Sequence, residues 1–410
     1  MKGKRLLLLC SIGLVAILAT LPIVGCTAQA PTPPSTPEAK TLPIGMILGM
    51  TGFFSVREIP DMNQTQFAAD IINEQGGITV NGQKYMVELV VEDTRSTMDG
   101  VTAAANKLVY DKGIKFIIGP TAFFAAAAGP VCDPNEILRV ITWCVNTPGE
   151  VDGSTPYAFL GGNGSVLTSG AATKYLKQAY PDVKKVAIVT PDDGAVPYVI
   201  PIAKNLLAAQ GISVVGEAIA YPNEMQDFSP IVAKLNAIEE ADAIFMQNGL
   251  VPHMGAIVKG LRESGNYKPY AGSLPARIGQ VMTIAGEEAM KDVFSIAYTP
   301  TDPNIPPVAK EIIDRTVAQF GADYQLEMSG PNCLWILKEM IEEAQSLDPT
   351  VVKNTWESTD QVETIFGTAK ICGDETFGIK HHVVASPQTV QILKDGVETS
   401  AGWIDIGVIP

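Results

Sequence analysis

The chain has 410 residues, of which 46% are hydrophobic and 18% are charged, enough for two or three domains with cores of their own. It carries 29 Lys and Arg against 44 Asp and Glu, a net charge of −15 at pH 7, which disfavours binding to nucleic-acid phosphates or anionic membrane surfaces. Three histidines and six cysteines follow no zinc-site spacing, and we expect neither a metal nor another cofactor.

The N-terminus predicts an export signal. Three basic residues precede an apolar run at residues 6–24, and a membrane anchor is the alternative because this run approaches the length of a membrane span. The sequence LPIVGC, which ends at Cys26, resembles the cleavage site of bacterial lipoproteins. That resemblance implies a signal peptide at residues 1–25 and a lipid on Cys26, which would anchor the exported protein at the extracytoplasmic face of a membrane, in the periplasm or at the cell surface. Residues 26–40 contain several prolines and little apolar material, and they predict a tether.

From residue 42 onwards, apolar runs alternate with stretches of helical periodicity. The strands expected in the first half are residues 42–49, 85–92, 115–118 and 138–142. The helices expected between and after them are residues 62–75, 99–111 and 121–133. Asp61 precedes the first of these helices, and we expect it to be the N-cap.

The same alternation restarts after a glycine-rich segment at residues 161–164, where a hinge or loop is expected rather than a phosphate cradle. The strands expected there are residues 185–189, 213–220, 243–246 and 268–271, and the helices are residues 167–180, 196–210, 229–240 and 252–264. Two longer helices and three short strands follow, at residues 307–320, 330–347, 364–369, 382–384 and 390–392. Repeated strand–helix units predict an α/β fold with two doubly wound parallel-sheet lobes, completed by the last segments.

Catalytic motifs are scarce. The sequence contains no GxxxxGK[ST] phosphate loop, HExxH zinc helix or GxSxG nucleophile elbow. Asp192 and Asp193 resemble a pair of acids for proton transfer, but they follow a strand and precede a glycine, so turn chemistry explains them equally well. His381 and His382 are expected to point to opposite faces of a strand, in a surface role rather than at a shared metal. An exported hydrolase is therefore only an alternative, and we expect no enzyme.

The cysteines beyond the tether leave two arrangements open. Export permits disulfides, and Cys132 with Cys144 or Cys333 with Cys372 are the pairs considered. Four buried free thiols are the other arrangement.

The loops that follow the expected strands supply the candidate binding residues. In parallel sheets, ligands lie beyond the carboxyl ends of the strands, and two lobes can face each other across a cleft there. These loops offer aromatic rings, small polar groups, amides at helix starts and a guanidinium, which suits a small solute with an apolar body and an anionic end. The candidates are Phe53, Thr121, Ala122, Phe123, Trp143, Cys144, Asn146, Asp193, Gly249, Leu250, Leu274 and Arg277. Among the arginines at 57, 95 and 277, the last is the best placed as a counter-charge.

Several passages together resemble a known family. They are residues 70–78 (DIINEQGGI), 92–93 (ED), 111–114 (DKGI), 116–120 (FIIGP), 185–189 (KVAIV) and 226–232 (QDFSPIV). In this order they resemble the type I periplasmic binding proteins of ABC importers, most of all the branched-chain amino-acid receptor family, from residue 44 to the C-terminus.

The resemblance implies two lobes that close on a solute by hinge motion at three crossovers, near residues 160–164, 297–300 and 366–370. The lobes would then comprise residues 41–162 with 298–367 and residues 163–297 with 368–410. It also implies no catalysis: such a protein captures a solute and delivers it to a membrane permease. A ligand-sensing receptor module of the same fold is the alternative.

The sequence departs from the family at the positions that hold an amino acid. Phe123 stands where the family carries a hydroxyl for the ligand carboxylate, with Thr121 close by, and Asn146 falls near the polar position after the fourth strand. Leu250 and Leu274 stand where acids or a tyrosine would hold the ammonium group. An unpaired buried ammonium is strongly disfavoured, so the departures favour an aromatic or aliphatic carboxylate.

Overall fold

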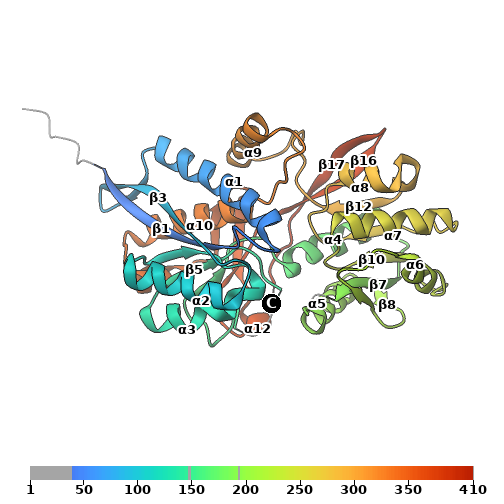
Figure 1. The fold of residues 1–410 in the computed structure, drawn as a ribbon, viewed down its shortest axis with the longest axis horizontal. Coiled ribbons are helices and arrows are strands. Elements are labelled where there is room, and N and C mark those ends of the chain that lie inside the picture. The colour runs from blue at the N-terminus through green and yellow to red at the C-terminus, as the bar shows by residue number, and fades with distance from the viewer. Residues whose placement is uncertain (1–38, 146–148, 193, 410) are drawn as a thin grey trace, which may run out of the picture. The chain divides into compact units, whose positions relative to one another are not determined.

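The computed structural model describes residues 39–145, 149–192 and 194–409 (Figure 1). The expected signal peptide, the lipidation site Cys26 and most of the tether lie outside the described residues, as do Asn146 and Asp193. Two sheets with helices on both faces make up the described part, and their central strands are parallel, so the predicted α/β class with two parallel-sheet lobes is confirmed. No helix in the described ranges has the length and apolar character needed to cross a membrane.

The first sheet has nine strands within the described ranges, in the order β13-β14-β15-β6-β5-β4-β1-β3-β2. Its parallel strands are β1 (Lys40–Leu48), β3 (Gln83–Asp93), β4 (Phe116–Ile118), β5 (Leu138–Ile141), β6 (Ala158–Leu160) and β15 (Val383–Ala385). The antiparallel strands are β2 (Ile78–Val80), β13 (Gln361–Thr364) and β14 (Gly367–Cys372). Strand β2 was not predicted, and the strand predicted at residues 364–369 spans the turn between β13 and β14.

Helices cover this sheet on both faces, as Figure 1 shows for α1 and α10 on one side and α2 and α3 on the other. One core contains side chains of α1 (Ser55–Glu74), α9 (Pro307–Phe320), α10 (Ser329–Ala344) and α11 (Pro349–Trp356). The opposite core contains side chains of α2 (Met98–Asn106) and α3 (Ala125–Cys132). Both faces of the central strands are therefore buried, which explains their continuous apolar sequences.

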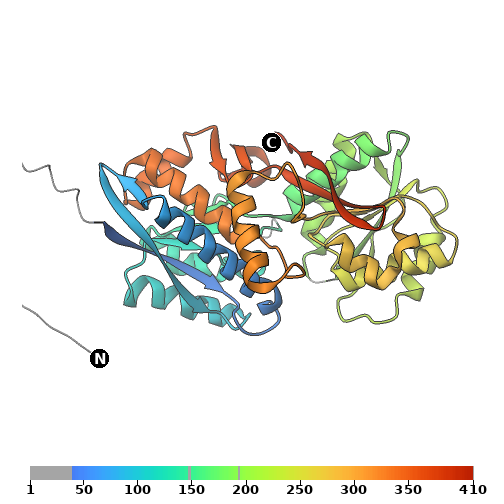
Figure 2. The same cartoon turned by 90° about the horizontal axis from the view of Figure 1, so that it is seen from above.

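The second sheet follows the order β17-β16-β12-β11-β10-β7-β8, with β9 beside β7. Its parallel strands are β7 (Lys185–Asp192), β8 (Ser213–Val214), β9 (Ile219–Pro222), β10 (Ala243–Met246), β11 (Tyr270–Gly272) and β12 (Val293–Ile296). An antiparallel hairpin of β16 (Gln388–Lys394) and β17 (Val397–Ile404), red in Figure 2, completes the edge. The flanking helices are α4 (Ser165–Ala179) and α5 (Val196–Ala209) on one face, and α6 (Ser229–Asn236), α7 (Val251–Glu263) and α8 (Ile278–Ala285) on the other.

The chain passes between the sheets after β6, after β12 and after β15. The third crossover was expected at residues 366–370, and that expectation is wrong. Strand β14 starts at Gly367 and pairs with β15 through Ile371 and Val384, so the chain remains in the first sheet until residue 385. The buried, apolar side chains of β14 extend the first core, and they drive this pairing.

Candidate ligand-binding site

A cavity of about 560 Å³ lies between the two lobes, where parallel strands of both sheets end. From the first lobe it is lined by the segments after β1, β3, β4 and β5, and from the second by the end of β7 and the segments after β9, β10 and β11. This is the place that the strand–helix pattern predicted, because parallel strands of one sheet all end at the same edge.

Five aromatic side chains form one wall of the cavity: Phe53, Phe54, Phe123, Phe124 and Trp143. The Phe54 ring contacts its neighbours at centroid distances of 5.3 Å to Phe53, 5.6 Å to Phe123 and 5.4 Å to Phe124. Such edge-to-face and tilted contacts fix the rings relative to one another. The wall is therefore a preformed apolar surface for the body of a small molecule.

Seven of the expected binding residues line the cavity: Phe53, Thr121, Ala122, Phe123, Trp143, Leu250 and Leu274. Cys144 is buried beside them but does not belong to the lining, and neither does Gly249, whose neighbours Asn248 and Leu250 do. Asp192 lines the cavity, while its neighbour in the expected acid pair falls outside the described residues. That these side chains contact a ligand remains a prediction.

Arg277 does not lie in the cavity, and its expected role as the counter-charge is therefore wrong. It precedes α8, and its Nη2 pairs with Glu398 of β17 at 2.9 Å. Its Nη1 donates a hydrogen bond to the carbonyl of Ala322 at 2.8 Å. A carboxylate on a hairpin far along the chain holds the guanidinium away from the cavity. The residues next to Arg277 in the sequence do not indicate this partner.

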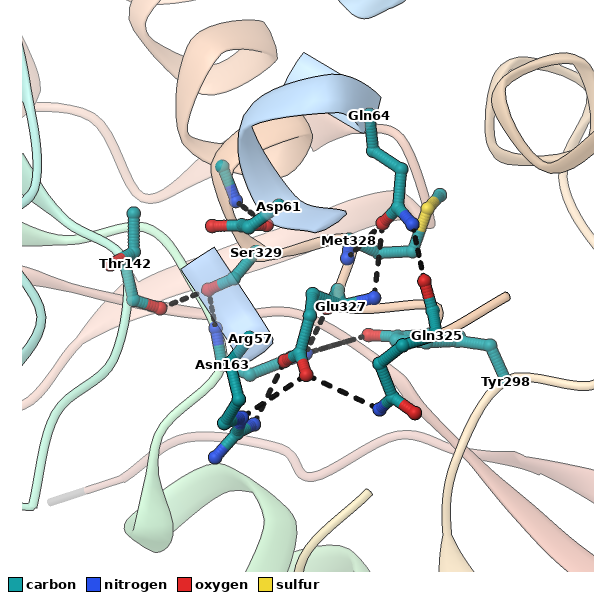
Figure 3. Close-up of polar contacts among 11 residues, drawn as sticks. Arg57, Asp61, Gln64, Thr142, Asn163, Tyr298, Gln325, Glu327, Met328 and Ser329 are labelled. Carbon is teal, nitrogen blue, oxygen red and sulfur yellow. Dashed lines mark hydrogen bonds and ion pairs between the residues drawn. The ribbon is translucent and has the colours of Figure 1, made fainter. Parts of the chain in front are cut away.

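The cavity contains a different cation, Arg57, on the first turn of α1. Its Nε and Nη2 donate to Glu327 at 3.1 and 2.8 Å (Figure 3). Its guanidinium also stacks 4.2 Å from the ring centroid of Trp143. The Glu327 side chain is fully buried and that of Arg57 is 23% exposed. A bidentate pair of this kind is both strong and directional, so Arg57 is held at the cavity wall.

Glu58 and Asp61 follow on the same helix and also line the cavity. Asp61 is not an N-cap, because α1 begins six residues earlier, at Ser55; its carboxylate accepts a hydrogen bond from the amide of Gly330 at 2.7 Å. Burial raises the pKa of Glu58 to about 8 and the pKa of Asp61 to about 7. Arg57 had been ranked behind Arg277, Asp61 was expected only as an N-cap and Glu58 was not singled out, because the predicted helix start lay too far along the chain. Their position just after a strand-end loop was the available signal.

A buried polar network connects this part of α1 to the chain crossovers, as Figure 3 shows. Gln64 accepts hydrogen bonds at 3.0 Å from the amides of both Glu327 and Met328. Asn163, in the first crossover, donates to the hydroxyl of Tyr298, in the second, at 3.0 Å. The amide of Asn163 also donates at 3.0 Å to the hydroxyl of Ser329, at the start of α10. The cavity wall and two crossovers are thus linked through satisfied hydrogen bonds, which are costly to break when buried.

Two further groups lie away from the cavity. His382 is fully buried, against the expected surface role: its ring stacks on Phe159 with a centroid distance of 3.9 Å, and its Nε2 lies 2.8 Å from a carboxylate oxygen of Glu357. The four cysteines in the described ranges are buried thiols outside any disulfide, which selects the second of the two arrangements left open by the sequence. No group of three or more potential metal ligands occurs in those ranges.

Two α/β lobes linked by several chain crossings, with a cavity between their strand ends, define a solute-binding protein of the hinged two-lobe class. The sequence model of the periplasmic binding protein family matches residues 41–396, and the chain belongs to that family. The family predicted from the sequence motifs is therefore confirmed. Members capture solutes and catalyse no reaction, so the chain is a binding protein, and the hydrolase alternative is set aside.

Known relatives agree with this assignment. The Leu/Ile/Val-binding protein BraC3 of Rhizobium johnstonii is 29% identical over 328 residues, which cover 79% of this chain and 85% of that protein. The leucine-binding protein LivK of Thermotoga maritima has a similar fold, with a TM-score of 0.68, 22% identity and coverage of 89% and 99%. A solute-binding protein of Rhodopseudomonas palustris in complex with 3,4-dihydroxybenzoic acid has a TM-score of 0.67, 19% identity and coverage of 89% and 98%. The two structures show that the fold is the type I periplasmic binding protein fold.

Proposed function

We propose that this chain is the extracytoplasmic substrate-binding protein of an ABC importer, which captures a small organic solute between its lobes and delivers it to a membrane permease. The solute is an aromatic or aliphatic carboxylate or an amino-acid-like compound. The relatives support both the amino-acid class and the aromatic-acid class of solute. Two are named as binding leucine or Leu/Ile/Val, and two are complexes with 3,4-dihydroxybenzoic acid or 4-hydroxybenzoate.

The observation that carries the proposal is a cavity lined from both lobes by aromatic and aliphatic side chains. Several of these side chains are exposed: Phe53 is 65% exposed, Val56 74% and Leu250 36%. Exposed apolar groups gathered around a cavity gain free energy when a solute covers them, at about 25 cal/mol per Å² of apolar surface. Binding would therefore favour closure of the lobes over the solute.

The lobes of this proposal are residues 41–162 with 298–385, and residues 163–297 with the segment from 388 onwards. They agree with the predicted division except at the third crossover. The lobes move about the three crossovers, and the hydrogen-bonded pair Asn163–Tyr298 lies where the first two run side by side. Cys26 carries the lipid anchor, and residues 26–40 give the lobes reach from the membrane.

Binding is tested on protein that has been unfolded, dialysed and refolded to remove a carried-over solute. Amino acids, benzoate, 4-hydroxybenzoate and short fatty acids are screened by thermal shift, because a solute that binds only the folded state raises the melting temperature. Small-angle scattering with the best solute should show a smaller radius of gyration. If none of the solutes shifts the melting temperature, the proposal fails.

Import and anchoring need separate measurements. Cells lacking this protein should lose uptake of the bound solute and regain it with the intact chain; unchanged uptake would favour the sensory alternative. A Cys26→Ala chain should leave the membrane fraction and lose incorporation of labelled fatty acid. Membrane association that persists in this variant would refute the lipid anchor.

A further inference from the structure

Glu58 is a buried carboxyl group with one oxygen unused. It lines the cavity and is only 5% exposed. Its Oε2 accepts a hydrogen bond from the amide of Gly49, at the end of β1. Its Oε1 is buried and has no hydrogen-bond partner among the described residues. A buried polar atom without a partner is rare, and it marks a place that a ligand group can satisfy.

The protonation state decides which kind of ligand group fits. Burial raises the pKa of Glu58 to about 8, so the carboxyl group is neutral at pH 7. Because Oε2 already accepts the Gly49 amide, the proton belongs on Oε1. The cavity wall therefore contains an O–H donor that lacks an acceptor, and a carboxylate oxygen is a strong acceptor for it.

Arg57 provides a second donor beside Glu58. Its Nε and Nη2 are used by Glu327, whereas its Nη1 has no recorded partner within the described ranges. The side chain lines the cavity and is 23% exposed, so its outer edge is accessible to a solute. A guanidinium that is already paired can still bind a second carboxylate, because its five N–H groups point in several directions.

We propose that Glu58, through Oε1–H, and Arg57, through Nη1, hold the carboxylate of an aromatic or aliphatic acid, while the aromatic wall receives its body. This inference rests on the proposed function and assigns the polar end of the same cavity. Glu58 and Arg57 would thus take over the carboxylate-binding role of the hydroxyl that the related family carries after β4, where this chain has Phe123. The competing hypothesis is that Glu58 is ionised and accepts a hydrogen bond from the amine of a cationic solute; the test below distinguishes the two.

The charges around Glu58 predict how binding depends on pH. On the same helix it faces Arg57 and Asp61, and Glu327 faces it from the segment before α10. Across the cavity, Asp192 and Glu224 are exposed acids of the second lobe. Asp93, at the end of β3, and Arg95, just after it, are exposed as well. Ionisation of Glu58 and Asp61 removes a donor and adds negative charge, so carboxylate affinity falls as the pH rises.

Calorimetric titrations with benzoate, 4-hydroxybenzoate, phenylpropionate, benzamide and benzylamine test this assignment. At about pH 6, at least one acid should bind about tenfold or more tightly than the amide and the amine. Its Kd should rise about tenfold by pH 9, because only about a tenth of Glu58 is then protonated. Glu58→Gln keeps an N–H donor but cannot ionise, so its affinity at pH 6 should stay within about threefold of wild type and its pH dependence should be flatter.

Asp70→Asn is the matched control, since it removes an acid from the same helix, α1, outside the cavity lining and should keep the wild-type pH dependence. The melting temperature of each variant, measured without solute, verifies that it is folded. Tighter binding of benzylamine than of every acid, or an unchanged pH dependence in Glu58→Gln, would overturn the assignment. If the acids fail but leucine or another solute binds with compaction, only this inference is lost. If no solute binds, the proposed function is lost with it.

Discussion

The ion pair between Arg57 and Glu327 should respond asymmetrically to removal of its two partners. The carboxylate of Glu327 is fully buried, and within the described ranges its other side-chain donor is Gln325, at 3.2 Å. The guanidinium of Arg57 is 23% exposed and also stacks on Trp143. Arg57→Met therefore leaves a buried negative charge with a single neutral side-chain donor, whereas Glu327→Gln leaves a cation that still reaches water and an aromatic face.

The magnitudes follow from this difference. Removing one partner of a buried pair costs about 3–5 kcal/mol, which we expect for Arg57→Met. Glu327→Gln keeps an acceptor for the guanidinium and loses the charge, so we expect about 1–3 kcal/mol. The double variant has no stranded charge and should cost less than the sum of the singles, by about 2 kcal/mol.

Urea unfolding at neutral pH, followed by tryptophan fluorescence and far-UV circular dichroism, measures these free energies where the two signals coincide. The control pair is Arg277 and Glu398, whose side chains are 12% and 13% exposed. Because neither of these partners is more buried than the other, Arg277→Met and Glu398→Gln should cost similar amounts. Equal costs for Arg57→Met and Glu327→Gln, or additive effects in the double variant, would refute the reasoning.

Three further predictions concern protonation, close packing and thiols. The pKa of Glu58 is about 8 in the folded chain against an ordinary 4.5, so the free energy of unfolding should fall as the pH rises through this interval. Urea unfolding of Glu58→Gln should show this fall reduced by up to about 5 kcal/mol. An equal fall in wild type and variant would contradict the raised pKa. Gly162→Ala should lower the melting temperature strongly, because the added Cβ would lie 1.9 Å from the carbonyl oxygen of Thr142. Gly153→Ala is the control and should melt like wild type, because its added Cβ would lie 3.4 Å from the nearest atom. Equal melting temperatures of the two variants would argue against the close approach at Gly162. The thiols of Cys132, Cys144, Cys333 and Cys372 are buried, so a thiol reagent should react with them only after the chain is unfolded, in buffer without reductant. A cysteine that stays unreactive in the unfolded chain would indicate a disulfide.

Local sequence periodicity was sufficient for most of the fold. The strand predicted at residues 243–246 coincides with β10, and the helix predicted at residues 307–320 coincides with α9. Such elements have a buried face that repeats along the sequence, so their apolar spacing is visible without the rest of the molecule. The strands that were missed are β2, β6, β12, β13 and β17; most of them are three or four residues long, and they depend on partners elsewhere in the sheet.

Asp61 illustrates where local signals mislead. An aspartate before an apolar stretch is typical of a helix N-cap, and the expected helix began at the next residue. In the structure its carboxylate accepts a hydrogen bond from Gly330, 269 residues further along the chain, while the helix already starts at Ser55. The start of α1 is thus set by tertiary contacts, and with it the charged end of the cavity.

The sequence by itself determined the two-lobe α/β class, the family and the loops that meet at the cavity, because apolar periodicity and the order of strands and helices are local properties. It also brought the right aromatic residues to that cavity. Only the tertiary structure decided which arginine lines the cavity. The carboxylate that positions Arg57 lies 270 residues away in Glu327, and the one that withdraws Arg277 lies 121 residues away in Glu398. The direction of a long charged side chain is chosen by the partner that folding brings to it, and no pattern of neighbouring residues encodes that partner.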